Sequence, residues 1–196
     1  MTGFKHANDT AMGNLNYERN ENDAYYTQEW CTVGLAEWAE KMFPDVNKWW
    51  EPACGSGQMV DVLRKRGWDV YESGLDDEVG RGNDLVDFLA PMPGFHSKRG
   101  IVTNPPYGEL AEQFIRKALT LTKKHELPVL MLMRHEYDCA KGRVDLFNQP
   151  PFVGKLVYTT RPRWIPNTTG APRHNYAVYA WRHGFTGSPT LHYHVK

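Results

Sequence analysis

The sequence lacks several features that would place it in a specialised class of protein. Its three cysteines, Cys31, Cys54 and Cys139, stand far apart and form no CxxC pair. This argues against a disulfide framework and a structural zinc site, and fits a reducing cytoplasm. No apolar run approaches the roughly 20 residues of a membrane-spanning helix, and the polar first thirty residues contain no signal-peptide core. We therefore expect a cytoplasmic protein without membrane or metal partners.

Net charge is also lacking, but the charges are unevenly distributed along the chain. Residues 1–94 contain eight Lys and Arg against seventeen Asp and Glu, whereas residues 95–196 contain fifteen against six. Such an asymmetry between halves is a hint of polyanion binding on one side of a protein. A folded domain in which the two sets of charges intermix in space explains the same counts equally well.

What is present indicates one folded domain. Of 196 residues, 41% are hydrophobic and 13% aromatic, enough for one sizeable core and too few for two full domains. Residues 1–22 are rich in Asn, Asp, Gly and Thr and show no periodicity, so we expect a flexible N-terminal arm. The domain is expected over residues 23–196.

Periodicity predicts alternating strands and helices. Helices are expected over 28–43, 58–66, 110–122 and 138–147; strands over 48–51, 68–72, 100–103, 128–133, 155–159 and 175–181; and a short apolar segment over 84–89. This alternation predicts an α/β fold with a parallel sheet covered by helices on both faces. Ligands of such sheets lie beyond the carboxyl ends of the strands, where two unusual turns occur here.

The first turn, Glu51-Pro-Ala-Cys-Gly-Ser-Gly57, joins a strand to a helix. Its glycines let the backbone approach a ligand, and the first helical N–H groups point toward that ligand. A glutamate would repel a pyrophosphate but suits a ligand with an ammonium group and a sulfonium. A simple turn with a capping serine would explain a lone glycine, but this full motif is much rarer by chance. The cofactor candidates are Glu51, Pro52, Ala53, Cys54, Gly55 and Gly57.

Two further positions are candidates for the same ligand. Glu72, with Ser73 beside it, ends the second predicted strand, where an acid can accept both ribose hydroxyls. Asp76 and Asp77 compete for that role, and a solvated acidic loop would explain all of these acids. Further on, Asp87 and Phe88 offer an acceptor for an adenine amine and a hydrophobic wall.

The second turn follows the strand over 100–103 and reads Asn104-Pro105-Pro106-Tyr107. An exocyclic adenine nitrogen is a poor nucleophile, because its lone pair is delocalised into the ring. The side-chain oxygen of Asn104 and the carbonyl of Pro105 can accept its two N–H groups and favour a pyramidal nitrogen. The prolines restrict the backbone, and Tyr107 offers a flat face for an extruded base, a stack of roughly 1–3 kcal/mol. The alternative is a rigid structural turn, with Tyr107 packed in the core and no role in binding.

These residues predict a direct in-line displacement without a covalent enzyme intermediate, in which positioning supplies most of the rate. The amide of Asn104 cannot act as a general base. We therefore expect the amine proton to leave to water after methyl transfer.

The two turns, in this order, resemble the S-adenosylmethionine-dependent methyltransferases that modify the N6 amine of adenine in DNA, in particular small phage-type members. The resemblance covers residues 23–183, including Arg161-Pro-Arg-Trp164 and Ala171 to Trp181. It implies a single-domain Rossmann-like class I methyltransferase fold with a mostly parallel seven-stranded sheet. It also implies S-adenosylmethionine as cofactor, with Asn104 beside it, S-adenosylhomocysteine as product, and DNA as partner. The segment from Asp23 to Trp30 is similar to the family's upstream motif, which makes Tyr25, Tyr26 and Thr27 cofactor candidates.

The chain departs from the family in one respect. Only 89 residues follow Tyr107, so no separate target-recognition domain is expected. The loop over 160–174 is the best candidate for DNA contact, because it mixes cations with an aromatic side chain. Its candidate substrate residues, in addition to Tyr107, are Arg161, Arg163, Trp164, Arg173 and His174. A proline-rich exposed loop with incidental charge remains the alternative.

Three other functions stay open. An Asn-Pro-Pro-Tyr turn serves planar amines generally, so methylation of an RNA base or of a protein glutamine amide would use the same residues. A non-catalytic module that only binds S-adenosylmethionine would keep the first turn. The sequence leaves the oligomeric state open between a monomer and a homodimer.

Overall fold

The computed structural model describes residues 27–77, 80–148, 151–164 and 171–196. Within them, eight strands form one sheet. The strands are β1 (Lys48–Glu51), β2 (Asp69–Gly74), β3 (Asp84–Leu85), β4 (Gly100–Thr103), β5 (Val129–Arg134), β6 (Phe152–Tyr158), β7 (Tyr176–Trp181) and β8 (Thr190–His194). The helices are α1 (Glu29–Met42), α2 (Gln58–Lys65), α3 (Glu109–Thr122) and α4 (Val144–Phe147), with short 3-10 turns η1 (Lys123–His125) and η2 (Lys141–Arg143).

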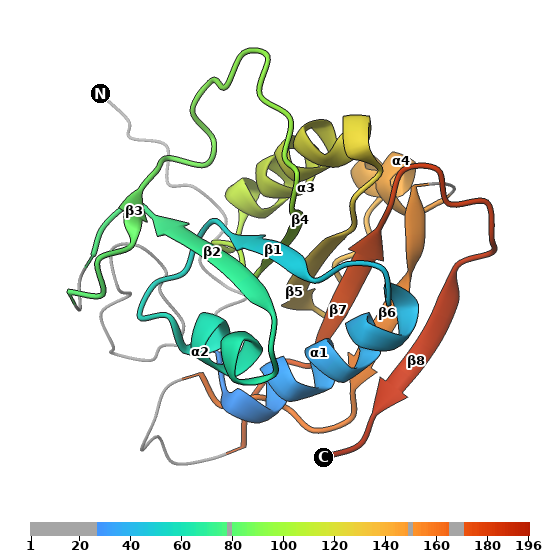
Figure 1. Ribbon diagram of the computed structural model, residues 1–196. Helices are drawn as coiled ribbons and strands as arrows, with labels where there is room; N and C mark the ends of the chain where they lie inside the picture. Colours follow the sequence, from blue (N-terminus) through green and yellow to red (C-terminus); the bar gives the residue numbers. More distant parts are fainter. Residues whose placement is uncertain (1–26, 78–79, 149–150, 165–170) are drawn as a thin grey trace, which may run out of the picture.

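The strand order is β3-β2-β1-β4-β5-β7-β6-β8 (Figure 1). Strand β1 pairs in parallel with β2 on one side and with β4 on the other, so the order reverses between β1 and β4. Strand β7 is antiparallel to both of its neighbours, β5 and β6. A reversal of this kind opens a crevice at the carboxyl ends of the two central strands, where α/β proteins bind ligands.

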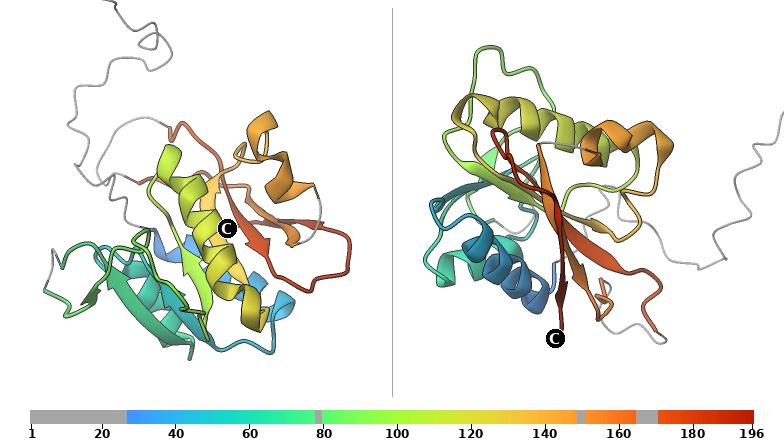
Figure 2. Two further views of the ribbon diagram at one scale, coloured as in Figure 1. Left: turned by 90° about the horizontal axis from the view of Figure 1, so that it is seen from above. Right: turned by 90° about the vertical axis from the view of Figure 1, so that its right-hand side faces the viewer.

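Helices cover both faces of the sheet. Figure 2 shows α1 and α2 on one side and α3 and α4 on the other. Neighbouring residues of β1 point to opposite faces, since Trp49 packs into the core with α1 and α2 while Trp50 packs with α3. Strand β4 is buried along its whole length and β5 up to Arg134, as expected for a parallel sheet covered on both faces.

Most of the predicted elements are confirmed. The strands over 48–51 and 100–103 have the expected bounds. Helices α2 and α3 differ from the expected bounds by one residue at one end, and α1 by one residue at each end. The α/β fold with a mostly parallel sheet and helices on both faces is therefore confirmed.

The expected number of seven strands is wrong, because the described chain contains eight. The unexpected strand is β8, which pairs in parallel with β6. Its outward side chains Leu191 and Tyr193 are exposed, while His192 and His194 lie against Trp38 and Trp30 of α1. The strand alternates, but its apolar side chains are exposed and its partly buried side chains are histidines. Because this reverses the usual pattern of apolar residues facing the core, the segment was not recognised as a strand of the sheet.

The helix expected over 138–147 is also wrong in its first half. Only the short α4 is α-helical, after the turn η2. The carboxylate of Asp138 is instead drawn to the buried amine of Lys155 on β6, at 2.9 and 3.0 Å. This ion pair holds the segment after β5 against the sheet and away from a helical path.

Candidate active site

One cavity lies at the carboxyl ends of β1 and β4. It collects residues from both predicted turns and from the segments after β2 and β3. Its lining consists of Thr27, Glu51, Pro52, Ala53, Cys54, Gly55, Ser56, Gln58, Met59, Gly74, Leu75, Asp76, Val86, Asp87, Phe88, Leu89, Asn104, Pro105, Pro106, Leu110 and Phe114. The structure thus brings together the two turns that the sequence singled out, although Glu51 and Asn104 are 53 positions apart.

The glycine turn after β1 has the backbone that the motif suggests. Gly55 and Gly57 have φ values of 49° and 76°, in the left-handed region where a side chain is strained. The N–H of Gly57 donates to the carbonyl of Cys54 at 2.8 Å, and the N–H of Cys54 donates to the carbonyl of Ser73 at 3.0 Å. The turn is therefore fixed to β2 and leads directly into α2.

The carboxyl group of Glu51 is the most deeply buried acid of the cavity, with 2% of the residue exposed. Its Oε1 accepts a hydrogen bond from the backbone N–H of Ala53 at 3.0 Å. Burial raises the pKa of Glu51 from 4.5 to about 8, and the nearby negative charge of Glu72 adds to this. A positive charge placed beside Glu51 would favour its ionised form.

The thiol of Cys54 lies in the same environment. Burial raises the pKa of Cys54 to about 12, and the charges of Glu51 and Glu72 act in the same direction. The cavity therefore holds this thiol in its protonated, unreactive form.

The charged groups of the cavity are all acids. Besides Glu51, Asp76 and Asp87 line it, whereas no lysine, arginine or histidine occurs among its described lining residues. Asp87 Oδ1 accepts the N–H of Leu89 at 2.9 Å, and Phe88 forms a buried wall against Trp50 and Phe114. Such a lining suits a cation with an apolar part and repels phosphate groups.

The side chain of Asn104 is held by two hydroxyl groups. Its Nδ2 donates to Thr27 Oγ1 at 3.3 Å, across 77 residues of sequence. Its Oδ1 accepts a hydrogen bond from the hydroxyl of Tyr107 at 3.1 Å. Pro105 and Pro106 continue the rim of the cavity. The contact between Thr27 and Asn104 was not foreseen from the sequence, which assigned Thr27 to the cofactor.

Next to this amide, three aromatic rings form a cluster. Tyr107 packs against Tyr176 at 6.1 Å between ring centroids, and Trp164 packs edge-on against Tyr176 at 4.7 Å. The cluster joins the predicted loop over 160–174 to the Asn-Pro-Pro-Tyr turn, called the reaction turn below. Tyr176 was foreseen only as the start of a strand, because alternation reveals burial and not proximity to a site.

The predicted basic residues lie beyond these rings. Arg161 donates to Asn175 Oδ1 at 2.7 Å and to the carbonyl of Pro172 at 3.1 Å, which ties the two described ends of the loop together. The backbone N–H of Arg163 donates to Gln28 Oε1 at 2.9 Å.

A group of positive charges surrounds His174. Partial burial, followed by the positive charges of Arg134, Arg173 and Arg161, lowers the pKa of His174, while Glu136 opposes this. Arg134 ends β5 and also lies near Tyr176. Its position at the end of a buried strand is the signal that could have identified it.

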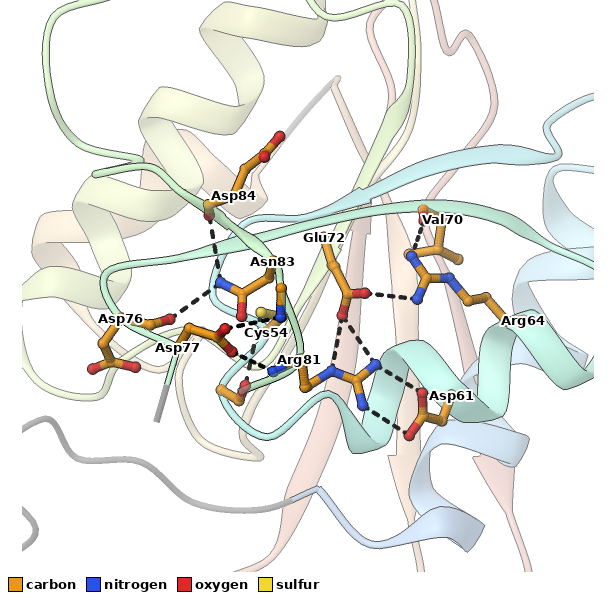
Figure 3. Close-up of polar contacts among 12 residues, drawn as sticks. Cys54, Asp61, Arg64, Val70, Glu72, Asp76, Asp77, Arg81, Asn83 and Asp84 are labelled. Atoms are coloured by element: carbon orange, nitrogen blue, oxygen red, sulfur yellow. Dashed lines mark hydrogen bonds and ion pairs between the residues drawn. The ribbon is translucent and has the colours of Figure 1, made fainter. Parts of the chain in front are cut away.

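Three predicted cofactor residues lie outside the cavity lining. Glu72 is bound by Arg64 and Arg81 (Figure 3). Ser73 is fully buried, and its hydroxyl accepts the indole N–H of Trp50 at 2.8 Å. Gly57 lies at the start of α2.

Tyr25 and Tyr26, and the expected arm over 1–22, lie outside the described residues. Within the described ranges, no cluster of three or more His, Cys, Asp and Glu could hold a metal ion. None of the described helices combines the length and hydrophobicity that crossing a membrane requires.

Comparison with known proteins gives similarity of fold. No family model and no curated protein matches the sequence. Among solved structures, a candidate RNA methyltransferase from Pyrococcus horikoshii superposes with a TM-score of 0.63 at 17% identity, over 88% of this chain and 94% of that one.

Two further structures match over a smaller share of their own length. A candidate class I S-adenosylmethionine-dependent methyltransferase from Listeria monocytogenes gives a TM-score of 0.58 at 16% identity, over 84% of this chain and 64% of that one. A modification subunit of a candidate type I restriction enzyme from Vibrio vulnificus gives 0.56 at 14% identity, over 88% and 47%. The chain therefore has the fold of these methyltransferases.

Proposed function

We propose that this protein transfers a methyl group from S-adenosylmethionine to the exocyclic N6 amine of adenine in DNA, after the base is flipped out of the duplex. One observation carries the proposal. The buried carboxyl of Glu51 and the amide of Asn104 line the same cavity at the ends of the adjacent parallel strands β1 and β4. A cationic cofactor and a planar amine would meet there.

The residues of the cavity fit this cofactor. A cationic ligand beside Glu51 offsets the cost of burying its carboxylate. We assign the ribose hydroxyls to Asp76, which lines the cavity, and the adenine ring to Asp87 and Phe88. When bound, the cofactor supplies a methyl group on a positively charged sulfur. A nucleotide would instead bring phosphates against three acids.

The reaction turn fits an amine. The amide oxygen of Asn104 is an acceptor, as its hydrogen bond from the hydroxyl of Tyr107 shows. In the proposed complex, this oxygen and the carbonyl of Pro105 accept the two N–H groups of the target amine. The hydrogen bonds to Thr27 and from Tyr107 fix the orientation of this amide.

The surroundings of the turn fit a nucleic acid. Tyr107 offers a face for the flipped base, a stack worth roughly 1–3 kcal/mol, and Tyr176 and Trp164 support it. The positive charges near His174 would contact phosphates. Asn104 cannot accept a proton, so the residues of this site act by positioning and the amine proton leaves to water.

The solved structures with a similar fold support methyl transfer, but they do not distinguish DNA, RNA and protein as the substrate. The Vibrio protein is described as a restriction modification subunit and the Pyrococcus protein as an RNA methyltransferase. The basic and aromatic surface favours a nucleic acid over a protein glutamine.

The proposal is tested with S-adenosylmethionine carrying a tritiated methyl group, incubated separately with duplex DNA of mixed sequence, transcribed RNA and a denatured protein pool. We expect label in DNA, recovered as N6-methyladenine after digestion and mass spectrometry. Label found only in RNA, or only in glutamine, would identify that molecule as the substrate instead of DNA. Cofactor binding without transfer to any pool would show that the protein only binds S-adenosylmethionine.

A variant pair locates the chemistry. Asn104→Ala should lower transfer at least a hundredfold, an order of magnitude typical of losing a positioned oxygen or donor, while cofactor affinity changes less than threefold. Asn148→Ala removes an exposed amide after α4 and should match the wild type. Wild-type transfer by the Asn104 variant would refute the role of the reaction turn.

A further inference from the structure

Arg81 occupies the space between the helix and the strand that follow the glycine turn. Its guanidinium donates to both oxygens of Asp61 on α2, at 2.8 and 3.1 Å, and to Glu72 Oε2 on β2, at 3.1 Å from Nε and from Nη2. Figure 3 shows the group placed between these two acids. Hydrogen bonds to Asp61 and Glu72 raise the pKa of Arg81 above the ordinary arginine value, so the side chain is charged at every physiological pH.

The same guanidinium lies against the glycine turn. A Cβ atom added to Gly57 would lie 2.0 Å from Arg81 Cζ and 2.1 Å from its Nε, closer than real Cβ atoms come to other atoms. Arg81 is not among the residues that line the cavity. It therefore packs against Gly57 of the turn, while residues 51–56 of the same turn line the cavity.

The backbone of Arg81 fixes the segment that carries Asp76. The N–H groups of Arg81 and Gly82 donate to the two oxygens of Asp77, at 2.6 and 2.8 Å. The buried Asn83 donates from Nδ2 to the carbonyl of Asp76 at 3.1 Å. Asp76, which lines the cavity, is thus joined through Asp77 to a residue whose side chain is bound to α2 and β2.

The ion pair of Arg81 with Glu72 is well shielded from water. Their side chains are 19% and 12% exposed, and Arg64 binds the other oxygen of Glu72 at 2.7 Å. Salt screens such a pair less than an exposed one. Without Arg81, the partly buried carboxylate of Glu72 would keep only Arg64 as a charged partner. Breaking such a pair destabilises the segments that it joins.

We propose that Arg81 is a positioning residue for the cofactor. It holds the glycine turn, α2, β2 and the Asp76 segment in their binding arrangement without touching the ligand. The inference rests on the proposed cofactor but not on the proposed DNA substrate. Without Arg81, the turn and Asp76 must be ordered when the ligand binds, and this ordering lowers affinity.

The test is isothermal titration calorimetry of S-adenosylmethionine and of S-adenosylhomocysteine with the full chain. Arg81→Met keeps the length and loses the charge, and should weaken both ligands about tenfold. At saturating cofactor, kcat for methyl transfer should stay within twofold of the wild type. A general loss of structure would instead lower kcat together with affinity.

Arg116→Met is the matched control. Arg116 also binds two acids, Glu112 at 2.9 Å and Asp145 at 2.7 Å, but on α3 and outside the cavity. It should leave cofactor affinity unchanged. Wild-type affinity in Arg81→Met, or an equal loss in both variants, would overturn the proposal.

Arg81→Lys covers the case in which the methionine variant fails to fold. An ammonium group keeps the charge but cannot bind both acids in the forked geometry of a guanidinium. We expect a threefold to fivefold loss of affinity with kcat unchanged, and wild-type affinity would again overturn the role of Arg81. Failure of the DNA assay alone would leave these binding results intact, so the two proposals can be judged separately.

Discussion

At the residue scale, the reaction turn depends on side chains that lie far from it in sequence. The Asn-Pro-Pro-Tyr motif is visible in the sequence, and its residues do lie on or beside one cavity. The hydrogen bond from Asn104 to Thr27 is not visible, because nothing in a pattern of residue types relates positions 77 apart.

Thr27→Val tests that hydrogen bond. Loss of one hydrogen bond costs about 1 kcal/mol, so we expect kcat to fall about fivefold to tenfold while the KM for DNA stays unchanged. Thr27→Ser keeps the hydroxyl and should restore the wild-type rate. If cofactor affinity falls and kcat does not, Thr27 serves the cofactor, as the family resemblance implies.

Glu51 should make stability depend on pH. Its pKa is about 8 in the folded protein, against 4.5 as the ordinary value. Between these values only the folded state keeps the proton, so stability falls as pH rises from about 4.5 to 8 and is constant above. The loss is on the order of a few kcal/mol, since each pKa unit corresponds to about 1.4 kcal/mol.

Glu51→Gln cannot titrate and should lack this contribution. Urea unfolding of both proteins without cofactor, at intervals from pH 5 to pH 9, measures the difference. The stability of the wild type relative to the variant should decline with rising pH. Parallel curves for the two proteins would contradict the buried, protonated carboxyl.

The acid proposed to bind the ribose shows where residue-level reasoning from sequence stops. Glu72 and Asp76 both carry a carboxyl group and are only four positions apart, and the sequence left both open. In the structure Glu72 is bound by Arg81, nine residues downstream, and Asp76 lines the cavity. A loop arginine carries no pattern that announces its partner, so this choice needed three-dimensional information.

At the element scale, a sharp turn motif fixes the end of a strand better than burial does. Strands β1 and β4 end at such motifs and were predicted to the residue. Strand β6 is buried along its whole length, yet it spans Phe152–Tyr158 instead of the predicted 155–159. Strand β8 was missed because its inward side chains are histidines packed on α1, while its apolar side chains are exposed. The bounds of α4 were missed because the ion pair of Lys155 with Asp138 holds the segment before it.

The start of β4 has a packing requirement that can be tested. A Cβ atom on Gly100 would lie 2.7 Å from the ring of Trp49, which is fully buried, and 3.2 Å from the carbonyl of Pro128. Overpacking of a core costs typically 1–3 kcal/mol. Gly100→Ala should therefore lower the melting temperature by about 3–10 °C.

Gly142→Ala is the control for that substitution. A Cβ atom there meets nothing within 4 Å, and the residue lies in η2. Thermal unfolding followed by circular dichroism should give the wild-type midpoint for this variant. Equal midpoints for all three proteins would show that Trp49 moves aside without cost.

At the scale of the whole molecule, the uneven charge along the chain is partly separated in space. Three acids of the first half line the cavity, and basic residues of the second half lie near His174. Other charges of the two halves intermix, since Arg99 pairs with Asp69 and Arg182 with Asp45. The α/β architecture itself was predictable, because element alternation constrains topology strongly.

Arg173→Ala tests the basic side as a DNA contact. Arg173 is exposed, so its removal should weaken binding to duplex DNA of any sequence and reduce the slope of log affinity against log salt by about 1. Fluorescence anisotropy at several salt concentrations measures both quantities. Lys124→Ala, in η1, should leave the slope unchanged. An Arg173→Ala variant with the same salt dependence as the wild type would show that DNA binds at another surface.

The three thiols differ in accessibility in a way that experiments can use directly. Cys31 is fully buried, and Cys54 is shielded within the cavity with its pKa raised to about 12. Cys139 is exposed on the segment that follows β5. A maleimide dye at neutral pH therefore attaches at one native position, and single-molecule fluorescence becomes possible without altering the sequence.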